Sequence, residues 1–165
     1  MNKVGKTSAG ATLVVAAACS TANLNSAPGG PIQVTRLRSE PYSFSYNSGF
    51  DQPARLVVRD PAAWQSAWQQ TFGRQRPVPP LPEIDFSREM VVLVALGSRA
   101  SGGYTILIDG ATSTDSGASI AVRSVSPGPK CGTTAALTQP VDIARVPRLT
   151  GNVSFVERNE VSQCE

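Results

Sequence analysis

The run MVVLVALG, from Met90 to Gly97, contains no polar side chain and decides how the rest of the chain must be arranged. A half-buried strand alternates apolar and polar residues, whereas a strand that is buried on both faces is a continuous apolar run. We therefore expect a central strand here, lying between a helix layer and a second layer of sheet or loop.

A helix is predicted upstream of this strand, from Pro61 to Phe72. Asp60 is a favourable N-cap, proline suits the first helical position, and Gly73 ends the pattern. Apolar residues at helical spacing line one face, which indicates a helix packed on a sheet; they are Ala63, Trp64, Ala67, Trp68 and Phe72. The two tryptophans could instead form an aromatic platform for a ligand, but the core is the favoured place for them.

Short apolar or alternating runs predict the remaining strands. They are YSFSYN (42–47), ARLVVRD (54–60), YTILID (104–109), ASIAVRSV (118–125), QPVDIARV (139–146) and NVSFVER (152–158). Pro140 and Pro147 bracket the fifth run and favour an edge position for it. The proline-rich segment 74–87 is expected to cross the surface in an extended conformation. The fold expected for residues 32–165 is a single α+β, mainly antiparallel β domain, a sheet or sandwich with one amphipathic helix packed on it.

The N-terminus has the pattern of an export signal. Two lysines precede a small and apolar run over residues 9–18, which predicts a signal peptide at residues 1–18 and is too short for a membrane-spanning helix. The sequence VAAAC, ending at Cys19, resembles the lipobox of bacterial lipoproteins, so Cys19 is predicted to carry acyl chains such as palmitate. The same alanines also suit an ordinary signal-peptidase site, which would leave Cys19 unmodified.

The segment 19–31 is then a lipidated N-terminus and a flexible tether. Ser20 follows the cysteine where aspartate would favour the inner membrane under the sorting rule of enteric bacteria. The expected location is therefore the cell envelope, on the outer membrane and facing the periplasm.

The cysteine count supports this arrangement. Three cysteines in an exported chain leave one thiol over, and acylation of Cys19 leaves Cys131 and Cys164 to form a disulfide. A functional thiol at Cys131 is the alternative, but the chain contains no histidine that could activate it.

Composition excludes several classes of function. An apolar content of 41% supports a folded core, and the absence of histidine removes the usual general base and the commonest metal ligand. Setting aside Lys3 and Lys6 of the leader leaves 13 basic residues against 12 acidic ones, with no concentrated basic face for nucleic acid. We therefore predict no catalytic site, no metal, no cofactor and no nucleic-acid partner. An enzyme or small-ligand site that uses the carboxylates of Asp109 and Asp115 is the weaker alternative, because aspartates are common in exposed turns and both residues are expected to lie in such turns.

The segment between the central strand and YTILID is the candidate interaction site. It lacks the lysine and Ser/Thr of a phosphate-binding loop and has no nucleophile elbow. Ser98 to Gly103 are expected to form an exposed turn, with Tyr104 beginning the next strand and packing its ring. The turn is either an ordinary hairpin or a loop that contacts a partner; the residues proposed for contact are Ser98, Arg99, Ser101, Gly102, Gly103 and Tyr104.

Four short motifs carry a family resemblance. They are Asp85-Phe86-Ser87, the strand Val91 to Gly97, the turn Ser101 to Tyr104, and the segment Pro140 to Pro147. Over residues 83–148 the chain resembles the C-terminal domain family of the protease-complex subunit PrcB. The resemblance implies a non-catalytic envelope protein that is accessory to a surface protease.

The expected function is thus a non-catalytic, lipid-anchored protein-interaction module whose partner is another envelope protein, with a protease as the partner that the resemblance implies. The alternative is an inhibitor of an envelope or secreted protease acting through residues 98–104. Chagasin-like protease inhibitors offer the analogy, since they present a Gly-Tyr or Gly-Trp loop between strands of a β-sandwich.

Overall fold

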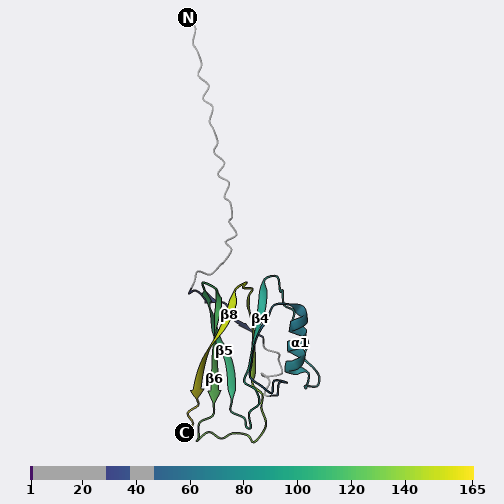
Figure 1. Cartoon of the computed structure of the whole chain (residues 1–165), viewed down its shortest axis with the longest axis vertical. Helices are drawn as coiled ribbons and strands as arrows, with labels where there is room; N and C mark the ends of the chain where they lie inside the picture. Colours follow the sequence, from purple (N-terminus) through teal and green to yellow (C-terminus); the bar gives the residue numbers. More distant parts are fainter. Residues whose placement is uncertain (2–28, 38–46) are drawn as a thin grey trace.

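The computed structural model describes Met1, residues 29–37 and residues 47–165. The predicted signal peptide, Cys19 and most of the predicted strand YSFSYN lie outside the described residues. The described residues form two four-stranded sheets with one helix against the outside of the second sheet (Figure 1). This is the sandwich-like, mainly antiparallel α+β fold that the sequence predicts.

The first sheet contains, in spatial order, β1 (Pro31–Ile32), β5 (Thr105–Thr114), β6 (Gly117–Ser126) and β8 (Asn152–Val161). The second contains β2 (Thr35–Arg36), β7 (Val141–Pro147), β4 (Glu89–Ala95) and β3 (Ala54–Val58). Among these strands β6 and β8 pair in parallel and the other pairs are antiparallel. The parallel pair arises because the chain leaves β6, forms β7 in the opposite sheet, and then returns to form β8.

The helix α1 (Pro61–Phe72) has the bounds predicted from the sequence. The Asp60 side chain caps it by accepting a hydrogen bond from the Ala63 backbone N–H at 2.8 Å. Trp64 and Trp68 are 2% and 3% exposed, and their indole N–H groups donate to carbonyls of the proline-rich segment, those of Pro82 and Pro79. The tryptophans therefore belong to the core, which is the interpretation that the sequence favours. Their hydrogen bonds also hold the extended segment against the helix.

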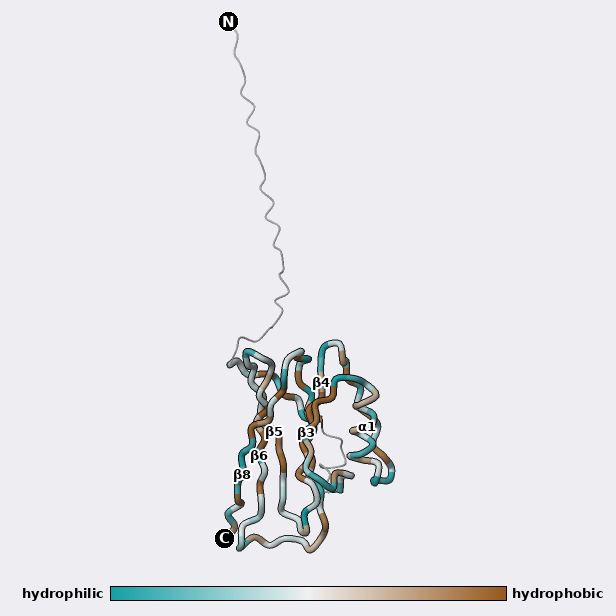
Figure 2. Tube along the Cα trace, viewed as in Figure 1, coloured by the Kyte–Doolittle hydropathy of each residue, from teal (hydrophilic) through white to brown (hydrophobic). Residues whose placement is uncertain are grey.

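The strand β4 is central and buried on both faces, which confirms the prediction. Met90, Val92 and Val94 face the other sheet, whereas Val91 and Leu93 face the helix. Figure 2 shows this strand as a brown, hydrophobic segment between the first sheet and α1. Each such side chain contributes about 1.5–3 kcal/mol by leaving water, so β4 supplies much of the stability of both layers.

The predicted edge position of the QPVDIARV strand is wrong. The strand β7 lies between β4 and β2, although β2 covers it over only two residues. The prolines do not interrupt the pairing because Pro140 precedes the strand and Pro147 is its last residue. At those positions a missing N–H removes no bond from the middle of the ladder.

The buried carboxylate of Asp142, on β7, joins the two sheets. Its Oδ2 accepts hydrogen bonds from the Ile108 N–H at 2.8 Å and from Arg36 Nε at 3.1 Å, and its Oδ1 accepts one from the Ile143 N–H at 3.0 Å. Burial raises the pKa of Asp142 above its ordinary value, against the opposing effect of these donors. The pattern of the sequence does not reveal this inter-sheet link.

Candidate functional site

The segment between β4 and β5 is a crossover between the two sheets, so the hairpin interpretation is wrong. The strand β4 lies in the second sheet and β5 in the first. Because β3 and β7 occupy both sides of β4, no edge of β4 is available to β5. The chain must therefore cross from one sheet to the other over residues 96–104.

Ser98 is held by a polar cluster at the start of the crossover. Its N–H donates to the Asp51 carbonyl at 3.0 Å. The buried side chain of Gln139 donates to Asp51 Oδ1 at 2.5 Å and to Ser98 Oγ at 3.3 Å. These contacts give Ser98 a structural role.

Arg99 is half-buried and pairs with the loop that precedes β7. It forms an isolated antiparallel bridge with Thr138, in which each N–H donates to the carbonyl of the other residue at 2.8 and 2.9 Å. The Thr138 hydroxyl also donates to the Ser101 carbonyl at 2.8 Å. The guanidinium of Arg99 lies 5.7 Å from the centroid of the Tyr104 ring, which is within cation–π range.

The two glycines allow a close approach between the crossover and the same loop. The Gly102 N–H donates to the Thr134 carbonyl at 2.9 Å, and a Cβ on Gly102 would collide with Thr134 Oγ1. Gly103 has φ +87°, and a Cβ there would lie 3.1 Å from Pro127. A side chain at Gly102 would have to displace the Thr134 hydroxyl, and one at Gly103 would be strained by the positive φ and would press on Pro127.

The exposed turn predicted for Ser98 to Gly103 is only partly present. Gly103 is exposed, but Gly102 is buried and Ser98 is half-buried. The Tyr104 ring packs against the core between the sheets, as predicted, although β5 begins one residue later, at Thr105.

The long loop between β6 and β7 runs along the end of the sandwich at which the C-terminus lies (Figure 1). The predicted disulfide between Cys131 and Cys164 is confirmed and ties this loop to the C-terminus, with the two Cα atoms 5.1 Å apart. Residues 132–137 are exposed, and Leu137 is 62% exposed. We call residues 98–104 together with residues 131–138 the composite loop surface.

The part of this surface that includes Thr134, Leu137 and Thr138 was not predicted from the sequence. The available signal is the small-residue run that follows Cys131, CGTTAALT, because such residues suit close backbone packing. The partner of that run could not be identified because it lies more than thirty residues earlier in the chain.

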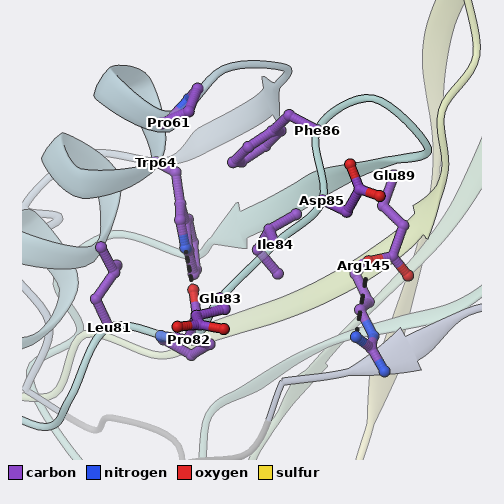
Figure 3. Close-up of a pocket in the computed structure, with 10 residues that line it drawn as sticks. All are labelled: Pro61, Trp64, Leu81, Pro82, Glu83, Ile84, Asp85, Phe86, Glu89 and Arg145. Carbon is purple, nitrogen blue, oxygen red and sulfur yellow. Dashed lines mark hydrogen bonds and ion pairs between the residues drawn. The ribbon is translucent and has the colours of Figure 1, made fainter.

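A pocket lies beside the helix, with a cavity volume of about 640 Å³. Figure 3 shows apolar groups on the helix side and an ionic group on the other. The lining residues are Pro61, Trp64, Leu81, Pro82, Glu83, Ile84, Asp85, Phe86, Glu89 and Arg145. The sequence did not predict this pocket, because it is built by the irregular segment 81–86.

The ionic side of the pocket is only partly satisfied within the protein, because the buried Nε of Arg145 has no hydrogen-bond partner among the described residues. Asp85 accepts hydrogen bonds from the Ser87 hydroxyl and N–H, at 2.5 and 3.0 Å, and these bonds lower the pKa of Asp85. Glu89 Oε2 lies 3.7 Å from Arg145 Nη1. A carboxyl group with a lowered pKa is ionised at neutral pH and is not poised as a general acid, so the pocket suits an apolar side chain better than proton transfer.

The two carboxylates of the alternative site lie in different places: Asp109 is within β5, rather than in the exposed turn expected for it, and Asp115 follows the end of that strand. Asp109 accepts two hydrogen bonds from Arg123, at 2.7 and 3.0 Å, and these bonds lower the pKa of Asp109. Asp115 lies in the exposed turn between β5 and β6. Within the described ranges, no group of three or more His, Cys, Asp or Glu side chains is placed to hold a metal ion. None of the helical residues that the structure describes makes a stretch long and apolar enough to cross a membrane.

Among known proteins, the chain is similar to one family over part of its length. Neither the curated proteins nor the solved structures contain a match to this chain. A family model described as PrcB C-terminal matches from the second residue of β4 to the end of β7, and the name of this family suggests association with a protease complex. Both halves of the composite loop surface lie inside the matched segment, whereas α1 and β8 lie outside it. Residues 90–147 thus match the PrcB C-terminal family, and the resemblance predicted from the sequence is confirmed over that segment.

Proposed function

We propose that this protein is a non-catalytic envelope protein that binds another envelope protein through the composite loop surface, as an accessory to a protease complex. The observation that carries the proposal is the exposure of Leu137 on a fixed loop. Its side chain is 62% exposed on a loop that is pinned on both sides, by the disulfide at Cys131 and by the bridge between Thr138 and Arg99. An apolar side chain presented by a fixed loop costs little conformational entropy on binding.

The composition of the surface supports binding to a protein. Residues 131–138 carry no charge, so burying them removes no charged group from water. Ala135 and Ala136 are small and exposed, which allows a partner to approach the backbone closely. Arg99 belongs to a residue type that often carries interface energy, and its guanidinium is already oriented by Tyr104.

The inhibitor alternative has less support. An inhibitory loop has to project its tip into the cleft of a protease. Gly102 is buried, and Tyr104 packs against the core. Of the Gly-Gly-Tyr segment only Gly103 is exposed, so the segment does not project as a tip, and this favours an accessory role over direct inhibition.

The membrane anchor is part of the same proposal. The charged leader and the sequence that ends at Cys19 support acylation of that cysteine and attachment to the outer membrane, facing the periplasm. Mass spectrometry of the mature, membrane-extracted protein is expected to find Cys19 as the first residue with acyl chains attached. An unmodified Cys19 in that material would contradict the anchor.

The interaction is tested by affinity capture from an envelope extract with the wild type and with Leu137→Lys. We expect the wild type to retain a protein partner and Leu137→Lys to retain at least tenfold less, because a charge in the centre of the contact has to be desolvated. Thr112→Lys, at an exposed position of β5, is the matched control and should capture as much as the wild type. Capture by Leu137→Lys equal to that of the control would argue against this surface.

A further inference from the structure

Among the residues that the structure describes, the strand β8 is a long sheet edge with no strand paired on its outer side. It lies at the end of the first sheet and spans ten residues, and within the described ranges only β6 pairs with it. Val156 is 59% exposed near its middle. An open edge of this length can pair with another strand.

The pairing with β6 determines which backbone groups of β8 point outward. The N–H groups of Asn152 and Ser162 donate to Ser116 and Ser126, so the even-numbered residues of the parallel ladder direct their backbone groups towards β6. The N–H and C=O groups of residues 153, 155, 157, 159 and 161 therefore point towards the open side. An added strand could form a continuous ladder with them.

The other sheet edges offer much less. The strands β1 and β2 contain two residues each. The strand β3 contains five, half as many as β8. The open edge of β8 is thus the one suited to extensive pairing among the described strands.

We propose that β8 pairs with β8 of a second copy of this chain, antiparallel about a two-fold axis at Val156. This register places Val156 opposite the same residue of the second copy, Ser154 opposite its Arg158, and Asn152 opposite its Glu160. No like charges then face each other directly across the interface, which is a requirement for cross-strand pairs. The two first sheets would join into one sheet that is continuous through the dimer.

The charges on β8 do not block this approach, because partners within the chain neutralise them. Arg158 Nη2 lies 2.8 Å from Glu160 Oε1, on the outer face of the sheet. Glu157 accepts two hydrogen bonds from Arg55, at 2.7 and 3.0 Å. The charged side chains that this register brings to the interface are therefore already in ion pairs within their own chain.

Cysteine cross-linking tests the register. In the full-length chain with Cys19→Ser, Val156→Cys is expected to form a disulfide-linked dimer on mild oxidation, because non-hydrogen-bonded residues opposite each other have Cα atoms about 4.5 Å apart. Ser154→Cys is the control: it would lie about 14 Å from its counterpart, at ~3.4 Å per residue, and should remain monomeric on reducing-agent-free gels. Equal cross-linking of both variants, or none at Val156→Cys, would overturn the register.

A second variant tests the interface without a cross-link. Sedimentation of the wild type should give the mass of two chains, and Val156→Lys should give the mass of one, because two lysines would meet at the axis. Leu137→Lys, equally exposed but on the composite loop surface, should remain a dimer, so failure of the dimer is distinguishable from failure of the proposed function. A wild-type monomer at all accessible concentrations, or a partner strand from another protein found on β8, would overturn the proposal.

Discussion

Replacing Asp142 with alanine is expected to lower the free energy of unfolding by about 2–4 kcal/mol. The change leaves the buried N–H groups of Ile108 and Ile143 without their acceptor, at roughly 1–3 kcal/mol for each unsatisfied group. It also takes the carboxylate away from Arg36, which is partly exposed and regains water. Urea denaturation measures the loss, and Asp115→Ala, in an exposed turn, is the control. A loss below 1 kcal/mol would show that Asp142 does not join the sheets.

The same residue gives a pH dependence with a defined sign. Because burial raises the pKa of Asp142 above 3.8, the folded protein binds the proton more tightly than the unfolded chain does. The contribution of this proton to stability is therefore fully present below about pH 3.8 and is lost as the pH rises through the raised pKa. The difference in unfolding free energy between the wild type and Asp142→Ala should shrink over that range. A difference that grows with pH would contradict the direction.

Loss of the disulfide is expected to cost about 3–4 kcal/mol in the double variant Cys131→Ala, Cys164→Ala. The two cysteines are 33 residues apart, and opening a loop of that length restores conformational entropy to the unfolded chain. The loop that carries Leu137 also loses one of its two anchors, so capture of the partner should fall along with stability. Chemical denaturation followed by capture measures both effects.

The control for the disulfide is the full chain with Cys19→Ala, which keeps the Cys131–Cys164 pair. Its unfolding free energy should equal that of the wild type, because Cys19 is not part of the disulfide. A double variant that unfolds at the same urea concentration as this control would show that the disulfide does not stabilise the domain.

The elements that could be predicted from the sequence are those with a strong local pattern. The run Met90 to Gly97 has no polar alternation, and only a strand covered on both faces accommodates that. The helix Pro61–Phe72 is delimited by an N-cap, a proline and a glycine, all of which act locally. The disulfide followed from the cysteine count.

What could not be predicted depends on contacts between distant segments. The Gly-Gly turn has the local pattern of a hairpin, but β4 already has a neighbour on each side, so the segment crosses to the other sheet. Asp142 resembles a solvent-facing position of an alternating strand, yet its partners, Arg36 and the Ile108 N–H, lie far away in the sequence. The parallel pairing of β6 and β8 depends on the path of β7, which no local pattern encodes.

Capture from the envelope extract, carried out in parallel with the wild type, Leu137→Lys and Val156→Lys, tests whether the composite loop surface binds the partner. We expect the wild type and Val156→Lys to retain the same partner, whereas Leu137→Lys does not. The melting temperature of Leu137→Lys should lie within about 2 °C of that of the wild type, because exposed substitutions change stability by about 0.5 kcal/mol or less. Retention of that partner by Leu137→Lys at the wild-type level would contradict the assignment of the composite loop surface.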